Sequence, residues 1–232
     1  MPQLSPDAPA TRPWDDHFAA SLRGFGPIGI LAIGAVYLGN SVFVPFGAIL
    51  VLIWAWRSRT PWSEIGFVLP ERWLRTVAMG IAFGVAFKLV MKALVMPLLG
   101  APPKNQAFQF LVGNTAALPY ILYVVLVGAA FGEEVLFRGY AFERFGKLFG
   151  RNRGAKPLIV LITAVWFGLE HYTLQGTAGV EQATIVGLVF GTIFAITGRL
   201  WMLIVAHAAF DLTAVAIIFW DFEWDVAHSV FR

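Results

Sequence analysis

Long apolar stretches separated by short polar segments run along most of this sequence. They cover residues 25–38, 41–56, 74–99, 117–142, 157–174, 180–197 and 200–220. A helix needs about 20 mostly apolar residues to cross the hydrocarbon layer of a membrane. Only 13% of the residues are charged, whereas a soluble domain carries about a quarter. The pattern therefore predicts an all-α fold, a polytopic bundle of transmembrane helices.

The number of spans depends on residues 25–56. The first two stretches are short for full crossings, but joined into one helix they would be ~48 Å long, which exceeds the ~30 Å layer. A break at Gly39, Asn40 and Ser41 favours a hairpin of two spans. We therefore expect about seven spans, within a range of six to eight.

The segments outside the spans set the expected domain limits and orientation. Residues 1–24 are rich in proline and polar residues, which predicts a disordered cytoplasmic tail and no cleaved signal peptide. Residues 25–220 form one membrane domain, and 221–232 form a C-terminal tail. Most lysines and arginines then lie on the side of the N-terminus, which the positive-inside rule assigns to the cytoplasm. We expect the plasma membrane of a prokaryote.

The absence of cysteine excludes disulfides, thiolate metal sites and cysteine nucleophiles. The net charge of +3 does not indicate nucleic acid as a partner, because the basic residues lie between apolar stretches. The expected partners are membrane lipid and a substrate at the membrane.

Several ionisable residues lie within the apolar stretches. An acid at the centre of a bilayer costs about 2.5–3.5 kcal/mol even on a lenient scale, so such groups should face the interior of the bundle. The six residues are Glu133, Glu134, Glu170, His171, His207 and Asp211.

The first group contains two adjacent acids and an arginine. Glu134 and Arg138 are four residues apart with the acid first, which favours an ion pair along a helix. Glu133 points in a different direction and is the candidate reactive carboxylate. The alternative is that both acids only form structural ion pairs near the cytoplasmic boundary.

Two further groups each place a pair of residues on one helical face. Phe167 and His171 are four apart, as are His207 and Asp211. His207 and Asp211 could bind a metal, stabilise an oxyanion or form a simple buried hydrogen bond. Glu170 points elsewhere, and Lys88 or Lys92 are its expected partners. Counting helical rise puts Glu133, His171 and His207 at similar depths, so a shared polar cavity open to the cytoplasm is expected.

These three motifs, in this order on three spans, resemble the CAAX protease and bacteriocin-processing (CPBP) family. Its pattern is Glu-Glu-x-x-x-Arg, then Phe-x-x-x-His, then His-x-x-x-Asn or Asp. The resemblance covers about residues 117–215, and residues 62–67 are similar to a cytoplasmic segment of prokaryotic members. Asp211 stands where the prenyl proteases of the family have Asn, which puts an oxyanion role for this residue in doubt because a carboxylate cannot donate a hydrogen bond.

The resemblance implies a membrane endopeptidase that cleaves a peptide bond near the cytoplasmic face with an activated water, in a CAAX-type or related substrate. Glu133 would be the general base, His171 would hold the water, and His207, helped or oriented by Asp211, would stabilise the oxyanion. Glu134, Arg138 and Phe167 would support them. Substrates would be membrane-associated or lipidated peptides or proteins.

Other interpretations stay open at this point. Glu133, His171 and His207 could hold zinc with a water, although a metal-free glutamate mechanism is slightly favoured. The chain could instead be an inactive membrane scaffold or immunity factor, or a proton-coupled transporter whose buried acids and histidines form a relay.

Overall fold

The computed structural model describes residues 13–42, 45–150 and 152–231, and every regular element in these residues is helical. The helices follow in this order: α1 (Pro13–Arg23), α2 (Pro27–Val42), α3 (Phe46–Arg57), η1 (Trp62–Ile65), α4 (Trp73–Val90), η2 (Met91–Val95), α5 (Met96–Leu98), η3 (Gln106–Leu111), η4 (Thr115–Ala117), α6 (Leu118–Tyr123), η5 (Val124–Ala141), α7 (Phe142–Phe149), α8 (Ala155–Glu170), α9 (Tyr172–Thr197), α10 (Trp201–Phe219) and α11 (Glu223–Ala227). The predicted all-α fold is confirmed.

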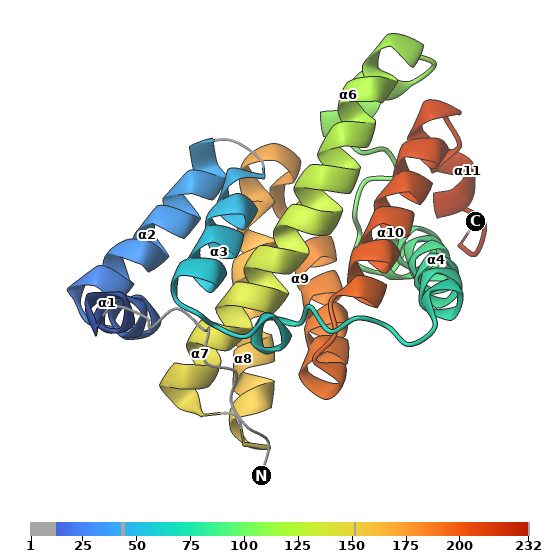
Figure 1. Cartoon of the computed structure of the whole chain (residues 1–232). Coiled ribbons are helices and arrows are strands. Elements are labelled where there is room, and N and C mark those ends of the chain that lie inside the picture. Colours follow the sequence, from blue (N-terminus) through green and yellow to red (C-terminus); the bar gives the residue numbers. More distant parts are fainter. Residues whose placement is uncertain (1–12, 43–44, 151, 232) are drawn as a thin grey trace.

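One long helical rod crosses the whole molecule. It runs through α6, η5 and α7 without a break and appears as the diagonal green-to-yellow ribbon in Figure 1. Its middle part, η5, is π-helical, a rare form that is frequent at functional sites. The first motif lies in this part of the rod, with α3 packed on one side and α10 on the other.

Close helix pairs surround the rod, with α4 along α10 and α8 along α9. Glycines allow the contact in both pairs. A Cβ atom at Gly84 would lie 2.1 Å from the carbonyl oxygen of Ala206, and one at Gly187 would lie 2.8 Å from the Cα atom of Ala164. The small residues in the spans therefore permit a compact bundle.

In the described part of the chain, four helices are long and apolar enough to cross a membrane: Trp73–Leu98, Thr115–Phe149, Tyr172–Thr197 and Trp201–Phe219. A fifth results if the bent pair formed by Asp15–Arg23 and Pro27–Ser41 is counted as one span. The helix Phe46–Arg57 is apolar but shorter. The predicted number of about seven spans is compatible with this arrangement and stays a prediction.

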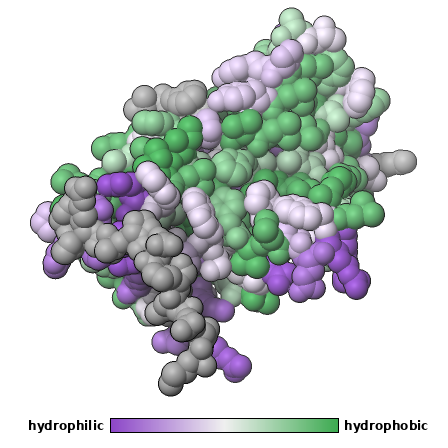
Figure 2. Space-filling model, viewed as in Figure 1, coloured by the Kyte–Doolittle hydropathy of each residue, from purple (hydrophilic) through white to green (hydrophobic). Residues whose placement is uncertain are grey.

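The outer surface is largely apolar. Figure 2 shows hydrophobic residues over most of the visible face, with hydrophilic residues mainly along its lower edge. Large apolar side chains such as Leu74 and Ile196 are 85% and 78% exposed. Such a surface suits contact with lipid rather than water.

The N-terminal region differs from the prediction in two ways. Residues 13–23 of the predicted disordered tail form helix α1, while residues 1–12 lie outside the described part of the chain. The predicted break at Gly39, Asn40 and Ser41 is helical, since α2 continues to Val42. Helices α2 and α3 do pack as a hairpin, and residues 43–44 between them are not described.

The C-terminal segment is also more ordered than a tail. After α10 the chain turns back at Asp221, and the short helix α11 packs against η2. Its first residue, Glu223, is 1% exposed. The segment predicted as a tail therefore contributes a buried carboxylate to the bundle.

Candidate active site

A cavity of about 410 Å³ lies inside the bundle. Glu133 of η5, His171 after α8, and His207 and Asp211 of α10 all line it, together with Phe167. The three motifs, which lie far apart in the sequence, thus contribute side chains to one cavity, as expected. The opening of this cavity to the cytoplasm stays a prediction.

Glu134 and Arg138 form the buried support of this cluster. The Nη1 atom of Arg138 lies 2.9 Å from Oε1 of Glu134, and the two side chains are 2% and 0% exposed. The expected ion pair is therefore present. The same Glu134 Oε1 atom lies 2.8 Å from Nδ1 of His207, a contact that the sequence did not predict. Glu134 thus ties the η5 helix to α10 as well as to Arg138.

His207 is oriented by that contact. Because the carboxylate of Glu134 can only accept, Nδ1 of His207 donates the hydrogen bond, and Nε2 faces the cavity. Nε2 lies 3.7 Å from Oε2 of Glu133 and 3.5 Å from Oδ2 of Asp211. The predicted common face of His207 and Asp211 is therefore present.

Glu133 has a free oxygen next to His207. Its side chain is 25% exposed, and its Oε2 atom has no hydrogen-bond partner among the described residues. The distance of 3.7 Å to His207 Nε2 is too long for a direct hydrogen bond. A buried oxygen of this kind requires a partner such as water.

His171 is held by its own helix. Its Nδ1 atom lies 2.8 Å from the carbonyl oxygen of Phe167, so Nδ1 donates and Nε2 carries the free lone pair. The Phe167 ring packs edge-on against the imidazole at 4.8 Å between centroids. The guanidinium of Arg138 lies 4.6 Å from the centroid of the same ring. Phe167 therefore separates and positions His171 and Arg138.

The arrangement of the acidic and histidine side chains determines whether this site could hold a metal ion. A catalytic zinc site needs three protein donors that converge on the ion at about 2 Å. Within the described ranges, no three His, Asp or Glu side chains are arranged so that they could hold a metal ion. In this arrangement the residues do not fit a metal. Whether the protein uses zinc stays a prediction.

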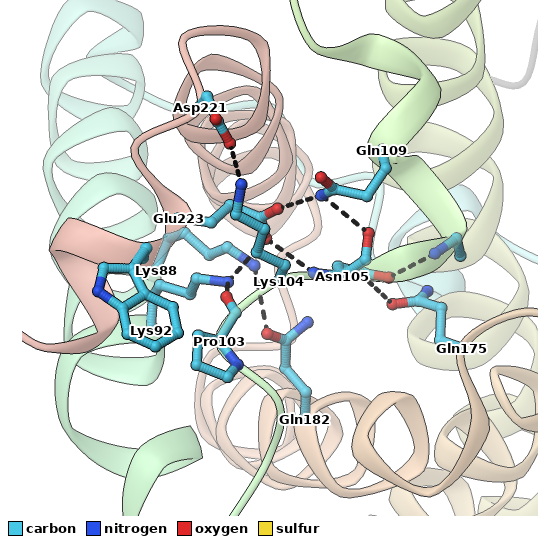
Figure 3. Close-up of polar contacts among 12 residues, drawn as sticks. Lys88, Lys92, Pro103, Lys104, Asn105, Gln109, Gln175, Gln182, Asp221 and Glu223 are labelled. Atoms are coloured by element: carbon cyan, nitrogen blue, oxygen red, sulfur yellow. Dashed lines mark hydrogen bonds and ion pairs between the residues drawn. The ribbon is translucent and has the colours of Figure 1, made fainter.

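A second polar cluster lines the other part of the cavity, and the sequence did not predict it (Figure 3). Glu223 of α11 accepts hydrogen bonds from Lys92 Nζ at 2.8 Å, from the backbone N of Asn105 at 3.0 Å and from Gln109 Nε2 at 2.5 Å. Asn105 in turn donates to Gln175 at 3.2 Å. These residues come from four separate parts of the chain, so no local motif indicates them.

The prediction that Glu170 pairs with Lys88 or Lys92 is wrong. Glu170 accepts a hydrogen bond from the indole Nε1 of Trp166 at 3.1 Å and is exposed. Lys88 instead bonds to Gln182, and Lys92 to Glu223. Trp166 is four residues before Glu170, so this helical contact was visible in the sequence.

Comparison with known proteins supports the resemblance. Residues 115–213 match the model of the Rce1-like family, described as type II CAAX prenyl endopeptidase Rce1-like. No significant match was found among curated proteins or among solved structures. The matched segment contains all three motifs. The first and third motifs lie on helices that are long and apolar enough to cross a membrane, whereas the second lies at the end of the shorter helix α8. The apolar helices and the match to a membrane protease family make the chain an integral membrane protein. Over residues 115–213, the chain is therefore similar to the Rce1-like family of type II CAAX prenyl endopeptidases.

Proposed function

We propose that the protein is an intramembrane endopeptidase in which Glu133 activates a water molecule for attack on a peptide bond. The observation that carries this proposal is the free Oε2 atom of Glu133, which faces His207 Nε2 across 3.7 Å inside the cavity. A water between two such groups would be within hydrogen-bond distance of both.

In the first step, Glu133 takes a proton from the water as the oxygen attacks the carbonyl carbon of the peptide bond. His171 holds the water by accepting a hydrogen bond at Nε2, since its Nδ1 is engaged with Phe167. His207, protonated on both nitrogens, donates from Nε2 to the developing oxyanion. The product of this step is a tetrahedral intermediate next to a protonated Glu133.

In the second step, the intermediate collapses and the C–N bond breaks. Glu133 returns its proton to the leaving nitrogen, so that the products are a carboxylic acid and an amine. One carboxylate thus acts as base and then as acid. No group of the protein is consumed, and the balance needs only water and the substrate.

Glu134, Arg138 and Asp211 position the reacting groups. Glu134 orients the His207 ring through Nδ1, and Arg138 compensates the charge of the buried Glu134 carboxylate. Asp211 lies 3.5 Å from His207 Nε2 and favours the protonated ring by its negative charge. Its role is electrostatic, because an ionised carboxylate donates no hydrogen bond.

The substrate proposed is a membrane-associated or lipidated peptide or protein, cut near the cytoplasmic face with the N-terminus of the enzyme in the cytoplasm. The family match supports a CAAX-type or related substrate. The cavity volume of about 410 Å³ lies in the range of sites that bind drug-sized ligands, which suits a short peptide segment.

The test compares Glu133→Gln with Glu170→Gln. Both changes neutralise a glutamate in the apolar part of the bundle, but Glu170 is exposed and bonds only to Trp166 in the described part of the chain. Membranes containing the wild-type protein and each variant are compared by quantitative proteomics of peptide termini. Fragments present with wild type and Glu170→Gln, and absent with Glu133→Gln, support the proposal. Equal fragments with all three proteins contradict it.

A further inference from the structure

Three lysines line the cavity, and they differ in how their charge is compensated. Lys92 lies 2.8 Å from Glu223, and Lys104 lies 2.6 Å from Asp221. Lys88 has no carboxylate within 4.0 Å among the described residues. Figure 3 shows the three side chains together with the acids that pair with two of them.

Lys88 is deeply buried for a charged residue. It is 7% exposed and lies in the middle of the Trp73–Leu98 helix, far from either end. Its Nζ atom donates to the neutral amide oxygen of Gln182 at 3.2 Å and lies 4.6 Å from the centroid of the Phe210 ring. An ammonium group in such surroundings is costly unless an anion compensates it. The negative charges of Asp211 and Glu223 act on the ammonium group without a direct ion pair, and the side chain lines the cavity.

The surroundings of Lys88 are suited to a carboxylate. The Gln182 amide accepts from Lys88 through Oε1, which leaves its NH₂ group to donate to a second acceptor. An ammonium group and an amide NH₂ side by side match the two oxygens of a carboxylate. Phe210 is three residues after His207 on α10, so Lys88 lies within about one helical turn, ~5 Å along the axis, of the level of His207.

We propose that Lys88 binds a carboxylate of the substrate peptide, and that the protein therefore selects peptides carrying a carboxylate within a few residues of the bond to be cut. This inference rests on the proposed peptidase function. The carboxylate can come from the end of a chain or from an Asp or Glu side chain. In either case the substrate carboxylate gives Lys88 a direct ion-pair partner, which Lys92 and Lys104 already have within the protein.

The first experiment measures binding without hydrolysis. Purified full-length Glu133→Gln protein in detergent is titrated calorimetrically with three probes of similar size: N-acetyl-trileucine, its C-terminal amide, and N-acetyl-Leu-Asp-Leu amide. We expect at least one acid probe to bind about 10- to 100-fold more tightly than the trileucine amide, as for a hydrogen bond to a charged group. Preference for the first acid indicates a chain terminus, and preference for the second indicates a side chain.

The matched variants are Lys88→Met, Lys88→Arg and Lys92→Met, each added to the Glu133→Gln protein. Lys88→Met should remove the preference for acid over amide, whereas Lys88→Arg should retain most of it. Lys92→Met should retain it too, even if that protein is less stable, because a ratio of affinities does not depend on the folded fraction. Equal binding of acids and amide, no binding of either acid, or an acid preference that survives Lys88→Met overturns the proposal.

A second experiment separates this proposal from the proposed function. Protein with Glu133 intact is incubated with a random-sequence peptide library prepared as free acids and as amides, and the products are identified by mass spectrometry. Cleavage without a carboxylate preference overturns the role of Lys88 and leaves the peptidase standing. Acid-selective binding lost in Lys88→Met, together with no cleavage of any peptide, supports Lys88 and contradicts the peptidase.

Discussion

The two halves of the cavity are built in opposite ways. Around His207, the essential contacts join residues of three short motifs, and each motif places its side chains one helical turn apart. Around Glu223, the contacts join residues more than a hundred positions apart, from η2, the loop before η3, and α11. Helical spacing predicts the contacts within each motif of the first half, but not the contact between Glu134 and His207. The contacts of the second half join distant parts of the chain, so no local spacing predicts them.

The two halves also treat charge differently. Glu134 and Glu223 are both almost fully buried acids that form an ion pair with a cation. Glu134 contacts Arg138 and His207, and so orients a group that faces the cavity. Glu223 instead joins the C-terminal helix α11 to the loop before η3 and to η3 itself. We therefore expect changes to groups that face the cavity near His207 to affect catalysis, and changes to the buried Glu134–Arg138 pair to affect the stability of the whole bundle. Changes near Glu223 should affect only the stability of that wall.

Arg138→Met should have the largest effect on stability. It leaves the carboxylate of Glu134 buried without its cation, and breaking a buried ion pair in this way costs about 3–5 kcal/mol. Unfolding of the purified protein in mixed micelles measures the change. Arg59→Met, which removes an arginine from an exposed ion pair with Asp16, is the control and should be close to wild type. Similar stability of the two variants would contradict the assigned importance of Glu134–Arg138.

His207→Ala should lower the cleavage rate by about 100-fold or more while the protein still folds, because it removes a donor to the oxyanion. The rate is measured on any substrate identified by the proteomic comparison. His228→Ala is the control, since His228 is exposed and stacks on Trp224 away from the cavity. A His207→Ala protein that cleaves at the wild-type rate would remove this residue from the mechanism.

Glu223→Gln should destabilise the second half of the cavity by about 1.5–3 kcal/mol, the range for hydrogen bonds to a charged group. Hydrogen exchange should show faster exchange in residues 101–112 and 221–228, with little change around η5. Asp225→Asn alters an exposed acid of the same short helix and is the control. If exchange increases equally throughout the bundle, the two halves are not separate in the way described.

Asp221→Asn should have the smallest effect, because the ion pair between Asp221 and Lys104 is exposed to solvent. The hydrogen bond to Asp221 raises the pKa of Lys104 above its ordinary value. A raised pKa of a lysine stabilises the folded state below the unfolded value, and this contribution is lost as the pH rises through the folded value. The melting temperatures of the variant and wild type should thus differ little at pH 7 and converge in strong alkali. A large difference at pH 7 would show that the pair is not solvent-screened.

The same contrast explains which features could be predicted from the sequence and which could not. Apolar length and helical spacing predicted the helices, the Glu134–Arg138 pair, the common face of His207 and Asp211, and the packing of Phe167 under His171. They could not reveal the contact between Glu134 and His207, which are 73 positions apart and meet only because α10 packs on η5.

The misses have physical causes too. Residues 13–23 look like a tail by composition, but Trp54 of α3 donates to the carbonyl oxygen of Leu22, which ties α1 to the bundle. Residues after 220 are polar and short, yet Glu223 finds three donors once the chain turns back. In both segments a long-range hydrogen bond outweighs the local preference for disorder.

The central claim is that Glu133, His171 and His207 share one water molecule inside the bundle. An experimental structure of the wild-type protein, at a resolution that reveals ordered water, tests it most directly. We predict a water within 2.6–3.2 Å, roughly hydrogen-bond distance, of a Glu133 oxygen and of Nε2 of at least one of the two histidines. A dry cavity, or a water that contacts Glu133 but neither imidazole, would contradict the claim.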